Sequence, residues 1–532
     1  RTQFFQQLNN NANGSYNFLG RWSGVPFADF LLGLPDSTSR QSRSSPAYLF
    51  STDAGLFVED QFTVSSRLTV NYGVRYETMR PPYEKYGRMS SFVPELGMVA
   101  IADARTIPDL AQRIAAAGLT GHVTTAGQAG LPNSLVYPNG WNFAPRFGFA
   151  LRPSGKSNMV VRGGYGIYYA NSLLNPIRND LTNVYPFAVS QTFNRVASQP
   201  QALTLGDPFP AKLASLPGVT NANGFELHPR PQYLQGYSFS IERQLGAVTT
   251  LEVEYTGSRG THLERQYDLN QPFRSAALRL PNGTFPRPFP GFGTINFYAF
   301  GSNSVYNAGS VTLRRIFRNG FFYGLTYVYG KSIDNASQVS GSSAGDYPGA
   351  QDSRDLRAER GRSDWDNGHS LLMFGSYVLP LRGGPWVRGW QISTTARLYT
   401  GQPFTPRVGN ANLNLGEANR PDRLSQGTLP DHGVQNWFNL AAFPVVPAGA
   451  FRFGNSGRNI LDGPGSATVN AALSKNFRVR DFGNAQIRCE AINVLNRANF
   501  GLPVDYVDAR NAGQIVSADA GRTLQFGFRL RF

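Results

Sequence analysis

The chain ends in R-T-L-Q-F-G-F-R-L-R-F, residues Arg522–Phe532, which alternates apolar and polar residues without a break. Successive side chains of a β-strand point to opposite faces of the sheet, so this segment predicts a strand with two chemically different faces. One face is apolar (Leu524, Phe526, Phe528, Leu530 and Phe532) and the other is polar and cationic (Gln525, Gly527, Arg529 and Arg531). At the edge of a soluble sheet such a strand invites aggregation, whereas in a closed membrane barrel one face meets lipid and the other a wet lumen. The length also fits the roughly 9–11 residues of a tilted spanning strand.

The same alternation recurs along the rest of the chain. It is clearest at Arg67–Glu77, Tyr233–Leu245, Phe321–Ile333 and Ala467–Val479. A soluble β-sandwich alternates as well, so the connections between the strands must decide between the two folds.

Short and long connections follow one another strictly along the sequence. Short links fall near Val64–Ser66, Pro153–Lys156, Gly246–Val248, Arg318–Gly320, Leu381–Pro385 and Arg480–Gly483. Long links fall near Pro81–Ala144, Asn171–Gln232, Leu263–Asn303, Asn335–Asn367, Gln402–Gly465 and Ala498–Gly521. Short turns at one end and long loops at the other are typical of bacterial outer-membrane barrels. We therefore predict an all-β, antiparallel transmembrane β-barrel of roughly thirteen or fourteen recognisable strands, with its C-terminus and short turns in the periplasm and its long loops outside the cell.

The composition excludes several other classes of protein. No stretch approaches the roughly 18 apolar residues of a membrane-spanning helix. The single cysteine, Cys489, excludes a disulfide framework within the chain, and its strand pattern predicts that it lies on an apolar face. The net charge of +16 indicates anionic partners. Because the arginines are spread over alternating strands and accompany no nucleic-acid-binding motif, we expect lipopolysaccharide phosphates or an anionic solute in the lumen, and no nucleic acid.

Several stretches resemble TonB-dependent outer-membrane receptors of the Oar-like type, in the usual order of that family. The most specific are Arg458–Phe477 (RNILDGPGSATVNAALSKNF), Arg488–Phe500 (RCEAINVLNRANF) and the terminal Phe532. The others are Phe27–Pro35, Gly55–Glu77, Ala144–Tyr169, Tyr237–Leu263 and Asp366–Pro380. The resemblance implies a barrel that takes up a bulky or scarce nutrient, gated by a plug that the TonB system drives from the inner membrane.

The N-terminal regulatory-like domain, the plug and the TonB box of that family do not occur in this sequence. The resemblance therefore implies the C-terminal part of such a receptor, with the first barrel strands upstream of Arg1. We expect residues 1–44 to be a loop-rich remnant of the barrel with at most a short helix near Phe27–Leu32, and residues 45–532 to be the barrel domain. Alone, the chain should form either a curved sheet whose first and last strands do not close well or an undersized barrel. Expected partners are outer-membrane lipid and the barrel-assembly machinery, which would engage the C-terminal strand.

Two sets of residues are candidates for contact with a plug or a ligand. Polar residues of the alternating strands are expected to face the lumen and the plug, and otherwise to serve solvation and cross-strand ion pairing: Arg75, Glu77, Glu242, Glu252, Glu254, Arg488, Glu490, Arg529 and Arg531. In one long connection, arginines interleave with Asp352, Asp355, Glu359, Asp364 and Asp366. We expect a salt-bridged external loop that also contacts ligand, because barrel loops carry recognition. Clustered carboxylates also suit calcium, although the spacing is not that of an EF-hand.

Covalent chemistry finds little support in the sequence. Gly341–Gly345 (GSSAG) matches the nucleophile-elbow pattern around Ser343, but it lies in a loop without the following helix that the motif needs. The five histidines lack zinc-ligand spacing, and His369 at a strand start suits a hydrogen bond at the barrel rim better than catalysis. We predict no enzyme activity, no cofactor and no metal site. The alternatives to a receptor are a plug-free porin-like or adhesin-like barrel, a secretion-linked outer-membrane protein, and a rim hydrolase that uses Ser343 or His369.

Overall fold

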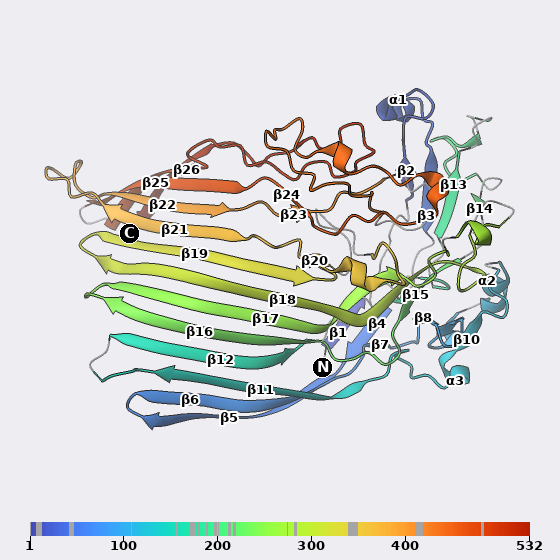
Figure 1. Cartoon of the computed structure of the whole chain (residues 1–532), viewed down its shortest axis with the longest axis horizontal. Coiled ribbons are helices and arrows are strands. Elements are labelled where there is room, and N and C mark those ends of the chain that lie inside the picture. Colours follow the sequence, from blue (N-terminus) through green and yellow to red (C-terminus); the bar gives the residue numbers. More distant parts are fainter. Residues whose placement is uncertain are drawn as a thin grey trace.

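The largest structural unit of the molecule is one curved, mainly antiparallel sheet (Figure 1). The computed structural model describes the chain except residues 1, 7–12, 42–46, 108, 117, 156–157, 171–176, 178–180, 183, 188–189, 196–198, 200–201, 211–213, 216–219, 274, 281–284, 339–348, 410–418, 480–482 and 532. Within the described residues, thirteen strands pair with their neighbours in sequence along one path from β5 to β27. These strands are β5 (Asp53–Ser65), β6 (Leu68–Met79), β11 (Asn139–Leu151), β12 (Met159–Tyr169), β16 (Tyr233–Leu245), β17 (Thr249–Asp268), β18 (Phe292–Arg318), β19 (Phe321–Asp334), β21 (His369–Val378), β22 (Trp390–Tyr399), β25 (Ser466–Val479), β26 (Gly483–Ile492) and β27 (Thr523–Arg531). The predicted all-β antiparallel fold is confirmed.

The two kinds of connection lie at opposite ends of the sheet, with the short turns at the left of Figure 1 and the long loops at the right. Between β18 and β19 the turn consists of Asn319 and Gly320 alone, both with positive φ (56° and 76°). Asn-Gly in this conformation matches the twist of two antiparallel strands, which explains the tight hairpin. The predicted sorting of short and long connections is therefore confirmed.

Two strands are much longer than the prediction allowed. The link predicted near Leu263–Asn303 is shorter than expected, because β17 continues to Asp268 and β18 begins at Phe292. Their pairing shifts register beside Leu263, where His262 adopts a φ of +53°. Such a shift marks a β-bulge, which bends the pair locally. Beyond the bulge, β15 (Thr220–Phe225) adds to β18 in parallel.

Cross-strand register fixes which side chains share a face, because directly opposed residues of an antiparallel pair point to the same side. Cys489 lies opposite both Phe526 and Leu473, so it is on the apolar face as predicted. On the other face, Glu490 lies opposite Gln525, and Arg488 lies opposite Gly527. The sheet therefore has one predominantly apolar face and one polar face across its whole width.

The long connections build their own small sheets and helices. The sheets comprise β1 (Thr2–Gln6), β4 (Ala47–Ser51) and β7 (Tyr83–Glu84); β8 (Ser90–Val93), β9 (Met98–Ile101) and β10 (Val123–Thr125); β2 (Ser15–Asn17), β3 (Ser37–Gln41), β13 (Ser190–Asn194) and β14 (Ala214–Ser215); and β23 (Pro403–Phe404) with β24 (Leu461–Asp462), while β20 (Gly361–Arg362) pairs with β19. The helices are α1 (Pro26–Leu31), α2 (Leu110–Ala116) and α3 (Ala126–Ala129), with short 3₁₀ turns η1 (Ala104–Thr106), η5 (Ala276–Leu278), η6 (Leu356–Glu359), η7 (Leu440–Ala442) and η8 (Ala448–Ala450). No helix in the described part of the chain is long and apolar enough to cross a membrane.

The hydrophobic core lies among these loops. Met89, Leu135 and Val136, from the connection between β6 and β11, pack in one buried cluster with Phe225 and Tyr298. The Phe225 and Tyr298 rings stack 4.6 Å apart, joining β15 to the extension of β18. The loops at this end therefore form a packed body that the sheet holds from one side.

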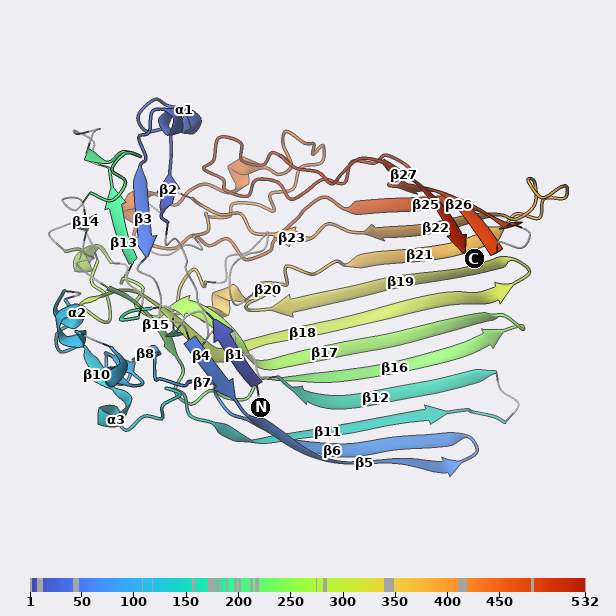
Figure 2. The same cartoon turned by 180° about the vertical axis from the view of Figure 1, so that it is seen from behind.

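Residues 1–44 contribute strands outside the large sheet. In this segment β1 pairs with β4, and β3 pairs with β2 and β13. These strands were not predicted, whereas the helix expected near Phe27–Leu32 is present as α1. In the described residues β5 and β27 each have one neighbour on the path, so the sheet does not close, as predicted. Figure 2 shows β26 and β27 crossing in front of the sheet near the C-terminus.

Candidate functional site

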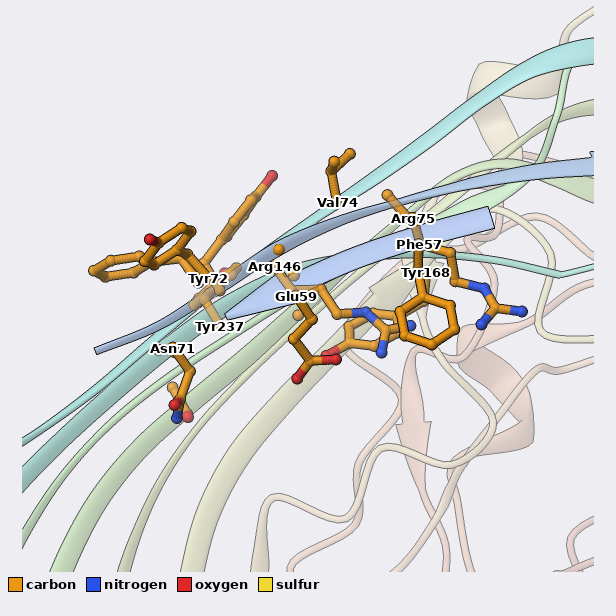
Figure 3. A pocket seen from close by; sticks show the side chains of 18 of the residues that line it. Phe57, Glu59, Asn71, Tyr72, Val74, Arg75, Arg146, Tyr168 and Tyr237 are labelled. Carbon is orange, nitrogen blue, oxygen red and sulfur yellow. The ribbon is translucent and has the colours of Figure 1, made fainter. Parts of the chain in front are cut away.

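A cavity of about 630 Å³ lies along β5, β6, β11, β12, β16 and β17 (Figure 3). Two cross-strand rows on the polar face contribute to its lining. In the first row Gly73, Arg146, Gly166 and Gly236 are paired in turn from β6 to β16. In the second row Asn71, Gly148, Gly164 and Ser238 are paired in the same way. Because glycine has no side chain, five glycines in adjacent positions leave this part of the wall hollow.

Charged and aromatic side chains surround this glycine-lined hollow. The Arg146 guanidinium lies 4.8 Å from the centre of the Tyr168 ring. Figure 3 shows Glu59, Asn71 and Arg146 on one side of the strands and Val74 on the other. The hollow thus combines glycine backbone, which the Tyr168 ring covers at Gly166, with both signs of charge and an aromatic surface. This combination suits contact with a polypeptide segment or a polar solute.

The register places the nine residues predicted to face the lumen on the polar face. The set comprises Arg75, Glu77, Glu242, Glu252, Glu254, Arg488, Glu490, Arg529 and Arg531. Arg162 donates to Glu242 across the β12–β16 pair at 2.8 Å, while Arg75 bonds Glu77 and Arg488 bonds Glu490 along their own strands. Ion pairing is therefore one role of this set, and contact with a plug stays a prediction.

Of those nine residues, Arg75 lines the cavity. The sequence interpretation missed Glu59, Arg146 and Tyr168, which also line it. The sequence features that could have indicated these residues are the glycines of Gly163–Gly166 and the Arg-Phe-Gly of residues 146–148. Only the strand register shows that these two segments are neighbours.

On the apolar face, the C-terminal strand presents large side chains to the outside. Phe526 is 76% exposed and Phe528 is 67% exposed on β27, and Leu524 and Leu530 are exposed on the same side. At the far edge of the sheet, Leu56 and Val58 of β5 are exposed in the same way. A water-facing surface would not gather such residues, whereas lipid would cover them. Phe532 lies outside the described residues.

In the long connection between β19 and β21, Glu359 is the centre of a buried ionic network. Its carboxylate accepts from Arg420 Nη1 at 2.7 Å and from Nη2 at 3.0 Å. Arg458 donates from Nε to the Glu359 carbonyl oxygen at 2.9 Å and pairs with Asp334. All three side chains are buried, so each charge depends on its partner.

The other four predicted loop carboxylates are bonded as well. Asp364 accepts from Asn459 at 2.7 Å, and Asp366 accepts from Arg362 at 2.8 Å. Asp352 accepts from the Arg354 backbone N–H at 3.0 Å, and Asp355 accepts from that of Arg357 at 3.2 Å. Glu359, Asp364 and Asp366 are buried, which makes them part of a salt-bridged scaffold. Asp352 and Asp355 are more accessible, and ligand contact by these two residues stays a prediction.

Several groups at the long-loop end have shifted pKa values. Hydrogen bonds from Arg452 lower the pKa of the Asp422 carboxyl, and those from Arg105 lower the pKa of Asp103. Burial raises the pKa of Tyr185 to about 12. These shifts in Asp422, Asp103 and Tyr185 lead away from neutrality, whereas burial raises the pKa of the Asp268 carboxyl toward it.

The candidates for chemistry are placed as follows. His369 Nδ1 lies 2.7 Å from the Tyr327 hydroxyl, and its ring lies 4.9 Å from that of Tyr329, so it takes part in an aromatic rim contact. The Gly341–Gly345 segment with Ser343 lies outside the described residues. Among the residues that the structure does describe, no three His, Cys, Asp or Glu side chains are arranged to hold a metal ion.

A wide antiparallel sheet with an apolar face, a polar face and sorted connections defines the wall of an outer-membrane β-barrel. The family model of the outer membrane beta barrel domain matches residues 1–525, and the chain belongs to that family. The fold predicted from the C-terminal strand and the loop lengths is thereby confirmed.

Solved structures of outer-membrane transporters and receptors are similar in fold. The outer membrane transporter YddB from Escherichia coli is 11% identical with a TM-score of 0.45, and the match covers 93% of this chain and 53% of that one. The siderophore receptor PiuA from Acinetobacter baumannii is 9% identical with a TM-score of 0.41, covering 92% and 43%. The ferric citrate transporter FecA is 10% identical with a TM-score of 0.41, covering 94% and 46%. The chain thus spans about half the length of these structures. No curated protein matches the chain.

Proposed function

We propose that this chain is the barrel portion of a TonB-dependent outer-membrane receptor that takes up a bulky or scarce nutrient. The observation that carries the proposal is the glycine-lined hollow on the polar face, flanked by Arg75, Arg146 and Glu59. Glycines in a strand often mark a place where another backbone approaches closely, so a folded plug can dock its own backbone and side chains there. The siderophore and citrate receptors to which the fold is similar support this class of cargo without naming the nutrient.

We also propose an orientation for the two ends of the sheet. We place the short turns and the C-terminus in the periplasm and the packed loop body outside the cell, because outer-membrane barrels have short periplasmic turns and longer external loops. In this orientation the loop body forms a vestibule, with Asp352 and Asp355 as candidate ligand contacts. Lipopolysaccharide would contact the outer rim, and the barrel-assembly machinery would engage β27.

Transport in this proposal needs no covalent chemistry from the chain. The loops capture the nutrient, the plug blocks the lumen, and energy delivered through TonB rearranges the plug. The polar face supplies charged side chains, such as Glu254 and Arg529, against which a polar plug can slide without leaving a buried charge unpaired.

Conductance and uptake of the intact gene product test the proposal together. In a planar bilayer we expect the intact protein to be closed, and to open reversibly in urea concentrations that unfold a plug while the barrel stays folded. Cells that lack the gene should lose uptake of the nutrient, and depletion of TonB should have the same effect. Steady conductance without urea would instead support a plug-free porin, and cargo retained in the periplasm of the deletion strain would support secretion.

A further inference from the structure

The short-turn end of the sheet concentrates positive charge. The arginines in or within a few residues of its turns include the following ten: Arg67, Arg152, Arg243, Arg314, Arg318, Arg382, Arg388, Arg478, Arg529 and Arg531. Among the described residues, none of these ten forms an ion pair with a carboxylate. The described acids of this end include Glu242, which bonds Arg162, and its cross-strand neighbour Glu252.

At the long-loop end, by contrast, many arginines are neutralised. Arg407 bonds Asp505, Arg420 bonds Glu359, and Arg452 bonds Asp422. The ten arginines of the short-turn end thus have no described carboxylate partner, as is also true of exposed long-loop arginines such as Arg357 and Arg510. An unpaired cationic rim of this size attracts anions.

Part of this charge is directed to the outside of the sheet. Arg243 lies opposite Leu251, so its side chain belongs to the apolar face. Arg318, Arg382 and Arg388 are exposed at the two turns that follow β18 and β21. These four residues form what we call the outer collar.

Aromatic rings lie at the same level as the outer collar. Phe321 and Tyr377 are in edge contact at 5.6 Å, and Trp386 lies 5.8 Å from Phe477. The Arg315 guanidinium lies 5.7 Å from the centre of the Phe321 ring. Aromatic girdles of membrane barrels lie at the boundary between hydrocarbon and headgroups, so the outer collar is at the depth of the lipid phosphates.

The buried side chain of Lys475 holds the turn that carries Arg382 and Arg388. Lys475 is 2% exposed, and its Nζ donates to the carbonyl oxygens of Pro385 at 2.8 Å and Arg388 at 2.5 Å. The same ammonium lies 5.2 Å from the centre of the Trp390 ring. A buried cation that satisfies two carbonyls fixes the turn, so its arginines are presented in a defined position.

We propose that the outer collar binds the headgroups of anionic phospholipids in the membrane leaflet on the short-turn side. The inference rests on the proposed function for its membrane setting, and it assigns the unpaired charge to phospholipid in place of lipopolysaccharide. Each basic residue near an anionic membrane surface contributes about 1 kcal/mol, which is roughly fivefold in association. Phosphatidylglycerol should therefore be enriched next to Trp386 and Trp390 over a zwitterionic lipid.

Tryptophan quenching by brominated lipids measures this enrichment. The full-length gene product is placed in phosphatidylcholine nanodiscs that contain either brominated phosphatidylglycerol or brominated phosphatidylcholine, and Trp386→Phe with Trp390→Phe identifies the signal from this end. We expect brominated phosphatidylglycerol to associate at least about fivefold more strongly at low salt, and less so at high salt. Changing Arg243, Arg318, Arg382 and Arg388 together to Gln should bring the ratio close to one.

A matched variant controls for the loss of four charges. Arg357, Arg360, Arg423 and Arg510 are exposed at the long-loop end, and changing these four to Gln should leave the lipid preference unchanged. Heat-modifiable electrophoretic mobility confirms that both variants fold. Equal quenching by the two lipids in the unmodified protein, or a preference that survives loss of the outer collar, would overturn the proposal. Loss of the preference on adding inorganic phosphate at constant ionic strength would assign the site to free phosphate and overturn the lipid assignment.

Failure of the orientation can be recognised separately. With Cys489 replaced by Ala, a cysteine at Gly384 should react with an impermeant maleimide only after the outer membrane is permeabilised. Reaction in intact cells would place the short turns outside and contradict the proposed orientation. The lipid preference in nanodiscs, which have no inside or outside, would not change.

Discussion

At the scale of single residues, the ion pair between Glu359 and Arg420 is the loop contact whose disruption we expect to cost much stability. Both side chains are 4% exposed, and two hydrogen bonds join them. Gln351 extends the network by donating its backbone N–H to Glu359 and accepting from the Arg420 backbone N–H. Removing one partner of such a pair leaves an uncompensated buried charge, which is far more costly than losing an exposed pair.

We expect Arg420→Met to destabilise the loop body by about 3–5 kcal/mol. Hydrogen–deuterium exchange measures this change. We expect faster exchange of the backbone amides of residues 351–362 and 419–423, while the amides of the strands stay protected. The double variant with Glu359→Leu should recover much of the loss, because it removes both charges together.

Arg452→Gln is the matched control for this pair. Arg452 is half exposed and bonds Asp422 in the same loop region, so its loss should cost about 1 kcal/mol or less. Equal effects of the two arginine substitutions, or no recovery in the double variant, would contradict the assigned role of the Glu359–Arg420 pair.

The sequence identified the loop carboxylates but not most of their partners. Glu359 and Arg420 are separated by 61 residues, and Asp364 and Asn459 by 95. From the sequence, any of the nearby arginines could pair with these carboxylates. Only the packing of one connection against another brings Arg420 and Arg458 to them. Arg362 with Asp366, four residues apart, is the pairing that local spacing could have suggested.

At the scale of one element, β27 separates the two faces by a single residue step. Phe526 lies opposite Cys489 on the apolar face, and Gln525 lies opposite Glu490 on the polar face. We expect Phe526→Arg to lower the free energy of unfolding by about 2–4 kcal/mol, because arginine on the lipid face is costly near the bilayer midplane. Gln525→Arg, which gains Glu490 as a cross-strand partner, should be tolerated.

Urea titration of the full-length protein in lipid vesicles, followed by heat-modifiable mobility, compares the two β27 variants. A similar loss of stability in both would show that the faces are not separated as the register implies. A loss in Gln525→Arg alone would invert the assignment of lipid and lumen.

Strand prediction succeeded where side chains alternate and failed where pairing is remote. The faces of β6, β16, β19 and β25 followed from period-two patterns, because each face meets a different medium. The extensions of β17 and β18 lie within a predicted loop. Beyond the membrane both faces of these strands meet protein, so apolar and polar side chains no longer alternate. Likewise β3 pairs with β13, a segment about 150 residues further on, which no local pattern encodes.

At the scale of the whole molecule, β5 and β27 are the two edges of the described strand path. Each of these strands has one neighbour on that path, and the path does not close on itself. We therefore expect β5 and β27 not to pair with each other in the membrane.

Disulfide cross-linking tests this expectation in the whole protein. With Cys489 replaced by Ala, a cysteine at Val58 should form no disulfide with cysteines scanned along Leu524–Leu530 of β27. A link from Val58 to β27 instead would show that β5 and β27 close the barrel directly.

Barrel class, the sorting of connections and the two faces could all be predicted, because lipid and water impose them along every strand. The loop body could not, since its clusters join residues such as Met89 and Tyr298 that lie in different connections. The glycine-lined hollow was missed for a related reason: each glycine is unremarkable in its own strand, and only register aligns them.

The length of β18 has a mechanical consequence. Its 27 residues far exceed the roughly 9–11 of a spanning strand, and its pairing with β17 runs unbroken except beside Leu263. One part of the β17–β18 pair belongs to the barrel wall, and the other part packs against the loop body through Tyr298. The β-bulge beside His262 lies between these two parts and is where their pairing is interrupted. We therefore expect a force on the outermost loops to bend the pair at this bulge and to leave the hydrogen bonds of the wall intact.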